Sequence, residues 1–294
     1  MKAKNFTAVT LAATIAFAAM APAAAQDAGE PGVTSEGVPD DTVFDGDFLS
    51  IGVGAGYGPS YTGSDDYVVF PLPIVQASVG GIDINPRPAG IAVDFVPDSG
   101  DGPDFSAGVV AKLNRDRASQ IEDPTVELLG ELDTAIEVGP TVGVSLPGVL
   151  NPFDSLSFTV DAVWDVAGAH DGMTVSPSVT YFTPLSRGIA ASLSLSTTYV
   201  DDDYADYYYT VSPAQSVVTG GVLPAYQADG GFESVGANIL LAADLDGDIT
   251  NGGLSIVGIA GYSRLLGDAK RTPLTSVVGS ADQFLVGAGI GYTF

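Results

Sequence analysis

The last eleven residues of the chain alternate strictly between large apolar and small side chains. One face carries Phe284, Val286, Ala288, Ile290, Tyr292 and Phe294, and the other carries Leu285, Gly287, Gly289, Gly291 and Thr293. Because a β-strand places successive side chains on opposite faces, one side of this strand is wholly apolar. A soluble antiparallel sheet usually turns a polar face outward, and this strand has none. The pattern is typical of a transmembrane barrel, with lipid outside and aromatic side chains at both interfaces.

Related alternation recurs along the chain. It predicts strands at 48–58, 67–79, 81–85, 89–96, 105–113, 135–146, 157–166, 173–182, 189–200, 234–245, 254–265 and 284–294. Asp161 and Asp165 should face the lumen, because a charge facing lipid is costly. The serines of 189–200 fit a wet interior. We therefore expect an all-β, antiparallel transmembrane β-barrel of about twelve strands. An even count places both ends of the barrel on one side, the periplasm, and the protein in the outer membrane.

The first two predicted strands contain residues that are unusual in a β-strand, namely a row of glycines and two prolines. The inner face of 48–58 is a row of glycines, Gly52, Gly54, Gly56 and Gly58. This row indicates that something packs closely inside, or that the barrel is narrow and strongly curved there. Pro71 and Pro73 interrupt the return strand and cannot donate backbone hydrogen bonds. They predict a bulge or an edge-like kink.

The N-terminus has the features of a secretory signal peptide over residues 1–25. Lys2 and Lys4 precede a short apolar run, and Ala23 to Ala25 form a cleavage site. Removing 25 of the 294 residues leaves 269. Residues 26–47 are rich in Asp, Glu, Gly and Pro and predict a disordered acidic leader, which is either a tether or a partner-binding tail. The barrel should then occupy 48–294.

Composition narrows the functional classes. No segment after residue 25 has about 18 consecutive apolar residues, which excludes transmembrane helices there. The chain has no Cys, which removes disulfides, thiol nucleophiles and Cys-based zinc sites. The net charge is −26, and loss of two lysines with the signal peptide makes it −28. Nucleic acid is a poor partner for such a chain, whereas acidic loops and an acidic lumen would attract cations. The alternative is that the acidic excess serves solubility or a saline habitat.

Catalytic and metal-binding candidates are few, and we predict no enzyme, cofactor or metal site. His170, the single histidine, reads as a plain loop residue, since catalysis would need an acid or a Ser placed against it. Asp244, Asp246 and Asp248 begin like a calcium loop, but Ile249 and Ser255 replace the required Gly and Glu. We expect a hairpin turn there.

The longest connection, 201–232, holds two further candidates. Its acidic cluster is either a solvated loop or a cation site near lipopolysaccharide phosphates; it comprises Asp201, Asp202, Asp203 and Asp206. Tyr207 to Tyr209 suggest a membrane-interface girdle rather than a ligand platform. In the next loop Arg264 falls on the lipid side. It should pair with Asp268 or reach a lipopolysaccharide phosphate.

Several stretches together resemble the MipA/OmpV family (MltA-interacting protein) of Gram-negative outer-membrane proteins. They are GVGAGYGPSYTGSDD at 52–66 with Pro71-Leu-Pro73, the segment 212–226 with its Ser-x-x-Gln core and LPAY, YSRLLGDA at 262–269, and GSADQF at 279–284. They span nearly the whole chain after the leader, in the family's order. The match is poorest at 82–146, where acids replace the family's basic residues.

The resemblance implies a non-enzymatic scaffold that links a lytic transglycosylase to a peptidoglycan-synthesising penicillin-binding protein. Its contact surface would be the periplasmic turns and the leader; the turns are 97–103, 147–154, 183–188 and 247–253. The alternative hypothesis is a narrow, cation-preferring channel for small solutes. Other expected partners are lipid, lipopolysaccharide and the barrel assembly machinery, which would read Tyr292 and Phe294. The chain should be a monomer.

Overall fold

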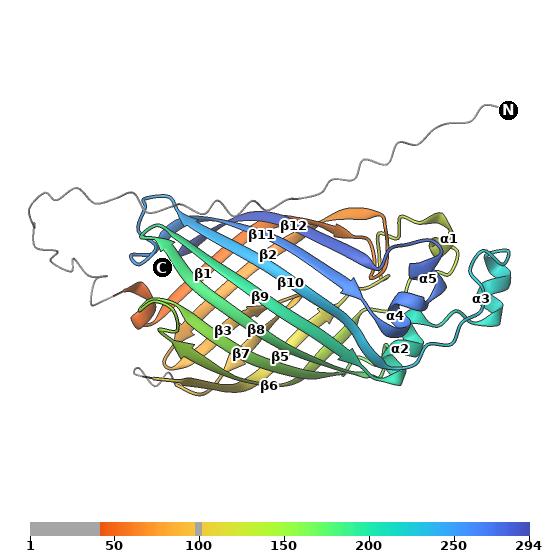
Figure 1. The fold of residues 1–294 in the computed structure, drawn as a ribbon, viewed down its shortest axis with the longest axis horizontal. Helices are drawn as coiled ribbons and strands as arrows, with labels where there is room; N and C mark the ends of the chain where they lie inside the picture. Colours follow the sequence, from red (N-terminus) through yellow and green to blue (C-terminus); the bar gives the residue numbers. More distant parts are fainter. Residues whose placement is uncertain (1–41, 98–101) are drawn as a thin grey trace, which may run out of the picture. The chain divides into compact units, whose positions relative to one another are not determined.

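The computed structural model describes residues 42–97 and 102–294, which form a closed antiparallel barrel of twelve strands (Figure 1). The strands are β1 (Phe48–Pro59), β2 (Tyr67–Val79), β3 (Ile82–Arg87), β4 (Gly90–Asp94), β5 (Asp104–Asn114), β6 (Ala135–Pro147), β7 (Ser155–Asp165), β8 (Met173–Ser186), β9 (Ile189–Val200), β10 (Gly231–Asp244), β11 (Gly253–Leu265) and β12 (Asp282–Thr293). The fold class and the strand count are therefore as predicted, and the strand ends differ by a few residues. The expected signal peptide, and the leader up to residue 41, lie outside the described residues.

Short helices lie outside the strands. They are the 3-10 helix η1 (Val43–Asp45) and the α-helices α1 (Pro124–Glu127), α2 (Asp202–Tyr209), α3 (Pro213–Val218), α4 (Gly267–Arg271) and α5 (Pro273–Ser276). In the described residues, no helix combines the length and hydropathy needed to span a bilayer. η1 lies within residues 42–47, which we expected to belong to the leader, and the Val43 N–H donates to the Thr250 carbonyl at 2.8 Å.

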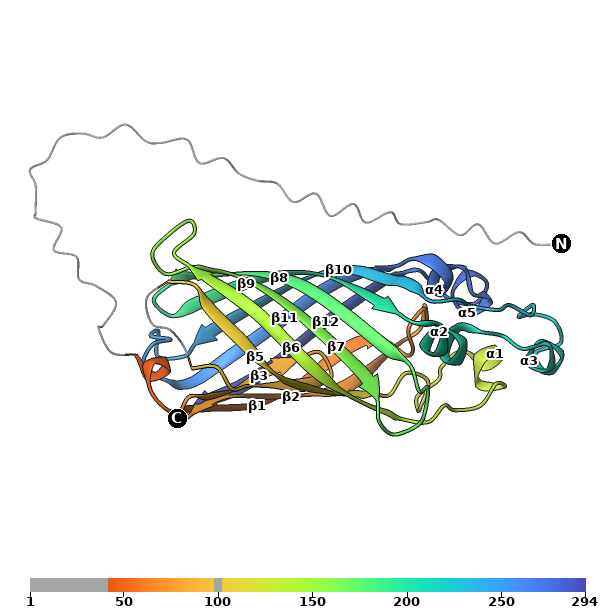
Figure 2. The same ribbon diagram turned by 90° about the horizontal axis from the view of Figure 1, so that it is seen from below.

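The barrel has two unlike ends, which Figure 2 shows in side view. At one end, called here the short-turn end, compact turns such as 187–188 and 245–252 join the strands, and the Phe294 N–H donates to the Leu49 carbonyl at 2.9 Å. The opposite, long-loop end carries the connections 60–66, 115–134, 166–172, 201–230 and 266–281. All five α-helices belong to these longer connections.

Aromatic side chains form a girdle on the outer face near the long-loop end. Neighbouring strands contribute ring pairs with centroids 5.2–5.7 Å apart, namely Tyr57 with Tyr67, Tyr199 with Phe232 and Tyr262 with Phe284. At the short-turn end, Tyr292 and Phe294 form another pair at 4.6 Å. Aromatic rings at both ends of an apolar outer band are what a membrane-spanning barrel requires.

The glycine row of β1 has both of its predicted roles, close strand packing and space for a side chain inside the barrel, at different positions along the strand. A Cβ at Gly54 would lie 2.4 Å from the carbonyl oxygen of Ala288 on β12, so the closing strands approach too tightly there for a side chain. Nearer the long-loop end, a Cβ at Gly56 would lie 2.6 Å from the ring of Phe70 on β2. The glycines thus permit the curvature of the closing seam and leave room for Phe70 inside the barrel.

The predicted bulge at Pro71 and Pro73 is wrong. The register between β1 and β2 runs unbroken through both prolines. On its other side β2 pairs with β3 only over Ala77–Val79, so the prolines occupy a stretch that behaves as an edge. Proline is tolerated at such an edge because no partner needs its missing N–H. The edge-like alternative is therefore the correct one.

Charged side chains gather on the inner wall of the barrel around Asp161. Thr141 Oγ1 donates to Asp161 Oδ1 at 2.7 Å, and Arg87 Nε and Lys112 Nζ each lie 3.3 Å from Asp161 Oδ2. Asp161 faces the lumen, as predicted. Asp165 instead ends β7, and its carboxylate accepts backbone N–H groups from the following loop, including that of His170 at 2.9 Å. It therefore caps a loop rather than lining the lumen.

The closing seam gives the first testable prediction. Gly54→Val should destabilise the refolded barrel by about 1–3 kcal/mol, because the new side chain meets the β12 backbone and the strands must separate. Gly258→Val in β11 is the matched control, since a Cβ there would meet no atom within 4 Å. Urea unfolding of both variants in detergent or lipid provides the measurement. Equal stability of the two variants would contradict this account of the seam.

Candidate functional site

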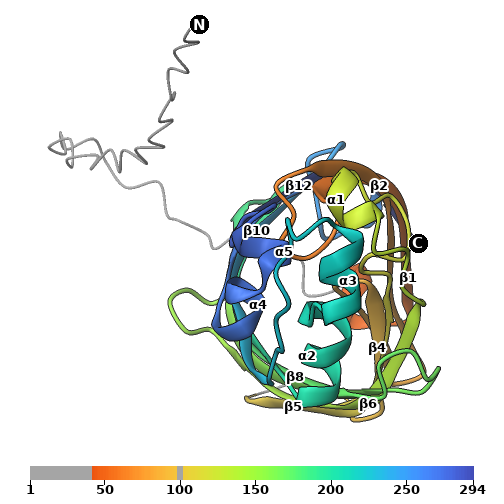
Figure 3. The same ribbon diagram turned by 90° about the vertical axis from the view of Figure 1, so that its right-hand side faces the viewer.

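A cap of helices and loops covers the long-loop end of the barrel. We define the cap as residues 60–66, 115–134, 201–230 and 266–281, which carry the helices α1 to α5. Viewed along the barrel, these helices lie across its opening (Figure 3). The cap is therefore the feature that decides whether the lumen communicates with this side.

Helix α2 supplies the core of the cap. Asp201 begins the helix by accepting the Tyr204 N–H at 3.1 Å, and its other oxygen accepts the Met173 N–H at 2.8 Å. The helical turn then directs Tyr204, Tyr208 and Tyr209 into a buried cluster, which also contains Val200, Ala205, Ala228, Leu265 and Ala269. The interpretation of Tyr207 to Tyr209 as a membrane girdle is wrong, since helix formation turns these residues into the cap.

The acidic residues around α2 are bound by the chain itself. Asp202 accepts the Gly230 N–H at 2.7 Å, and Asp206 accepts Gln227 Nε2 at 2.7 Å. No group of three or more His, Cys, Asp or Glu side chains is arranged to hold a metal ion in the described part of the chain. The carboxylates serve as helix and loop caps.

A second apolar cluster joins all four segments of the cap. It contains Tyr61, Val126, Val211, Leu223 and Leu274. Ser212 and Gln215 form a reciprocal capping box at the start of α3, with bonds of 3.3 and 2.8 Å. Gln283 Nε2 donates to the Ser64 carbonyl at 3.0 Å. Segments distant in sequence are thus fixed together by both apolar and polar contacts.

The stretches that carry the family resemblance meet in this cap. Tyr61, Leu265 and Gln283 come from three of these stretches, and Ser212 and Leu223 come from the fourth. Each lies in or beside one of the two clusters. The sequence alone did not predict that these stretches meet, because the contacts that a loop makes with distant segments cannot be read from its own residues. The only available signal was that all of them follow or precede a strand at the same end of the barrel.

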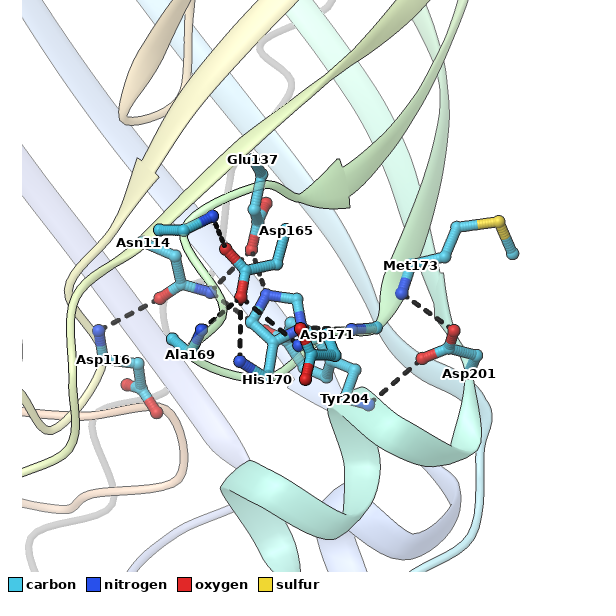
Figure 4. A network of polar contacts seen from close by, with 12 residues as sticks. Asn114, Asp116, Glu137, Asp165, Ala169, His170, Asp171, Met173, Asp201 and Tyr204 are labelled. Atoms are coloured by element: carbon cyan, nitrogen blue, oxygen red, sulfur yellow. Dashed lines mark hydrogen bonds and ion pairs between the residues drawn. The ribbon is translucent and has the colours of Figure 1, made fainter.

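His170 is buried beneath α2 rather than exposed in its loop (Figure 4). Its Nδ1 accepts the Gly172 N–H at 3.0 Å, which leaves Nε2 as the donor to Glu137 Oε1 at 3.2 Å. Asn114 Nδ2 also donates to this carboxylate oxygen at 3.0 Å. The imidazole packs edge-on against the Tyr204 ring, with centroids 5.0 Å apart. His170 therefore links the barrel wall to the cap.

Other ionisable groups in the cap are shielded from water. Asp116 accepts the Thr62 N–H at 2.6 Å, and burial raises the pKa of this carboxyl. Burial also lowers the pKa of the Arg117 guanidinium, which the charge of Asp116 partly offsets. Burial raises the pKa of the Tyr204 and Tyr209 hydroxyls well above the usual value, so both are neutral at physiological pH. Tyr209 donates to the buried Glu233 at the end of β10.

Arg264 does not pair with Asp268. It lies 2.8 Å from Asp282, directly opposite on β12, and the Tyr262 hydroxyl donates to the same carboxylate at 2.6 Å. Asp268 pairs with Arg271 within α4. The predicted partner is wrong because cross-strand register places Asp282 beside the guanidinium.

At the short-turn end, acidic residues organise turns. Asp244 Oδ1 accepts the N–H groups of Asp246 and Gly247 at 2.9 and 3.0 Å, which confirms the predicted hairpin turn. Arg187 from the neighbouring hairpin donates to Asp248 at 2.9 Å, and this bond lowers the pKa of the Asp248 carboxyl to about 2.

The comparisons with known proteins give one family and several distant structural neighbours. The family described as MltA-interacting protein MipA matches residues 51–294. No curated protein matches. Among solved structures, the COG4313 outer membrane channel from Pseudomonas putida F1 shares 13% identity over 90% of this chain and 100% of its own, with a TM-score of 0.43. The toluene transporter TodX of Pseudomonas putida shares 10% identity over 85% and 89%, with a TM-score of 0.36. OmpT of Vibrio cholerae shares 7% over 84% and 97%, with a TM-score of 0.35.

Removing the Tyr209 hydroxyl should loosen the cap. Tyr209→Phe leaves the buried Glu233 carboxylate without this donor, which should cost about 1.5–3 kcal/mol. The loss should appear as faster hydrogen exchange in 201–230, with the strands unchanged. Tyr226→Phe is the control, because Tyr226 packs against the same clusters and its hydroxyl makes no hydrogen bond to any residue that the structure describes. Equal exchange in both variants would contradict the role of the Tyr209–Glu233 bond.

The Arg187–Asp248 contact predicts a pH dependence of the turn. The pKa of Asp248 falls from an ordinary 3.8 to about 2 on folding, so the contact stabilises the turn above pH 3.8 and is lost as pH falls through 2. Arg187→Gln should return the Asp248 pKa towards 3.8, as followed by NMR titration of the carboxyl carbon. Arg271→Gln, which removes the partner of Asp268, should leave Asp248 unchanged.

Proposed function

The chain belongs to the MltA-interacting protein MipA family, and we propose that this outer-membrane barrel is a non-enzymatic adaptor that links a lytic transglycosylase to peptidoglycan synthesis. The short-turn end, with both ends of the barrel domain, would face the periplasm, where such enzymes act. The long-loop end with its cap would face outward, since long connections in bacterial barrels are extracellular.

The observation that carries the proposal, beside the family, is the cap. An open pore needs a wet passage at both ends, whereas here buried tyrosines and the His170–Glu137 contact fill the wall-to-cap junction. The only histidine is held by these structural contacts, which supports a role without catalysis. A barrel sealed on the outside is suited to presenting its periplasmic rim.

Two neighbouring hairpins offer a firm surface at that rim. Asp154 accepts the N–H of Val149 at 2.7 Å and the Tyr181 hydroxyl at 2.7 Å, and Asn151 Nδ2 reaches Thr183 Oγ1 at 3.1 Å. These bonds tie the β6–β7 turn to β8. Leu150 is 78% exposed and Phe153 is 53% exposed on the same turn. Exposed apolar side chains on a rigid turn support a protein contact.

A narrow, cation-preferring channel is the second candidate. The net charge of −26 favours cations over anions. This function would require the cap to move. For the remaining partners we propose lipid and lipopolysaccharide around the outer face, the assembly machinery at Tyr292 and Phe294, and a monomeric state without nucleic acid.

Conductance separates the two candidates. In a planar bilayer the refolded barrel should be silent, because the cap closes it. Replacing 202–228 with a short Gly-Ser linker should open a cation-selective conductance, since the chain as a whole carries a net charge of −26. A steady cation current through the intact protein would overturn the adaptor proposal and make transport the primary role.

Capture of murein enzymes tests the adaptor directly. The intact protein should recover a lytic transglycosylase from envelope extract, and the double variant Leu150→Ser with Phe153→Ser should lose at least about ten-fold of it, equivalent to about 1.4 kcal/mol. Leu128→Ser is the control, since Leu128 is 58% exposed in the cap at the opposite end. Failure of the intact protein to recover any murein enzyme would refute the proposal.

A further inference from the structure

The wall of the barrel is incomplete beside β2. β3 pairs with β2 only over Ala77–Val79, and the short β3–β4 hairpin turns back at residues 88–89. Among the described residues, no strand pairs with the remaining side of β2 from Tyr67 to Gln76. We call this segment the β2 edge.

The β2 edge lies at the level of the membrane. Its upper end is Tyr67, which belongs to the aromatic girdle through its contact with Tyr57. Below it, the outward side chains of Val69 and Val75 are 63% and 37% exposed and continue the apolar outer band. The unpaired backbone of the β2 edge therefore lies at the height of the hydrocarbon core and away from bulk water.

The two prolines are placed where they keep this edge unpaired. An unbroken β1–β2 ladder uses the N–H groups of alternate residues, and Pro71 and Pro73 have none, so the ladder must use the even-numbered positions. The odd-numbered positions then point towards the edge, where proline removes two of the donors between Val69 and Val75. A further strand would therefore find few hydrogen-bond donors at this edge. The edge also exposes fewer backbone N–H groups that hydrocarbon cannot satisfy.

The edge still carries backbone carbonyls, which hydrocarbon cannot satisfy. Water from the lumen can reach them only if the wall is permeable at this place. The borders are firm. The hairpin tip carries Ala89 in the left-handed region at φ 53°, and the Thr62 N–H, donating to Asp116 at 2.6 Å, ties the loops that flank the upper side. The β2 edge thus lies between the β3–β4 hairpin on one side and the joined loops 60–66 and 115–134 on the other.

An apolar strip lines the lumen beside this edge. It consists of Phe70, Leu72 and Ile74 on β2, Leu240 on β10, Ile259 on β11 and Leu285 on β12. Leu72 and Ile259 lie so close to the glycine row of β12 that a Cβ at Gly287 would be 2.7 and 3.1 Å from them. Leu240, on the inner face opposite Ile259, is 37% exposed.

This strip is unusual for the interior of an outer-membrane barrel, which is normally polar. Charged side chains lie on the other border of the β2 edge, since Arg87 stands on β3 and Lys112 on β5, and both contact Asp161 of β7. The β2 edge thus has an apolar strip on its own strand and a charged cluster on its β3 side.

We propose that the β2 edge is a lateral portal through which the acyl chain of a membrane lipid enters and lies on the apolar strip. The β2 edge stands at the height of the hydrocarbon core, the strip lies on the inner face of the same strand, and acyl chains are the apolar molecules that the bilayer supplies at that height. The site does not depend on whether the barrel is an adaptor or a channel.

Single cysteines test the portal, because the chain contains none of its own. Leu72→Cys places a bimane label on the strip, Val69→Cys places one on the lipid side, and Ser194→Cys places one on the lumen side of β9, which is paired on both sides. Each labelled protein is reconstituted in phosphatidylcholine with brominated acyl chains, and the fluorescence is compared with that in unbrominated lipid.

We expect the Leu72 label to be quenched at least half as strongly as the Val69 label, and the Ser194 label to keep its fluorescence. Equal, weak quenching of the Leu72 and Ser194 labels would overturn the proposal. So would quenching of the Leu72 label by 1-bromododecane but not by brominated lipid, since a free hydrocarbon would then be the occupant. Ile74→Cys replaces Leu72→Cys if the latter lacks heat-modifiable mobility.

Discussion

The structure depends on one constraint, that backbone N–H and C=O groups facing hydrocarbon must find partners within the protein. The β1–β12 ladder satisfies it by closing the sheet, and Gly54 allows the two strands to approach closely enough. Among the described residues, each of the other strands has a pairing partner on both sides over at least part of its length. The β2 edge is the departure from this rule, and Pro71 and Pro73 reduce its cost by removing donors.

The glycines that permit closure also shape the interior. Because glycines occupy the middle of the inner faces of β1 and β12, Phe70 and Leu72 lie close to the seam, and the lumen gains an apolar wall there. The opposite wall keeps Asp161 with its two cationic partners, because Thr141 and those partners compensate a buried carboxylate. One sequence feature thus determines both the closure of the barrel and the asymmetry of its lumen.

The strands could be predicted because each depends on a local period of two, which lipid enforces on every strand alike. Contacts that depend on distant segments could not. The sequence pattern places Tyr208 at the membrane interface, because it does not show that Asp201 begins a helix. It also gives Arg264 the wrong partner, because the true partner, Asp282, is 18 residues away in sequence. His170 looked like a loop residue since Glu137 and Tyr204 come from other elements. The cap lies almost wholly in this second class.

The position of the cap limits what the family resemblance can say about function. Its residues, such as Tyr61 and Leu223, are used to fasten loops to one another at the long-loop end. A sealed adaptor and a gated channel both need that fastening, so these residues do not distinguish the two. The distinction lies at the other end, where Leu150 and Phe153 stand on a turn that Asp154 holds in place. An adaptor needs such a rim, whereas a channel has no use for exposed apolar side chains there.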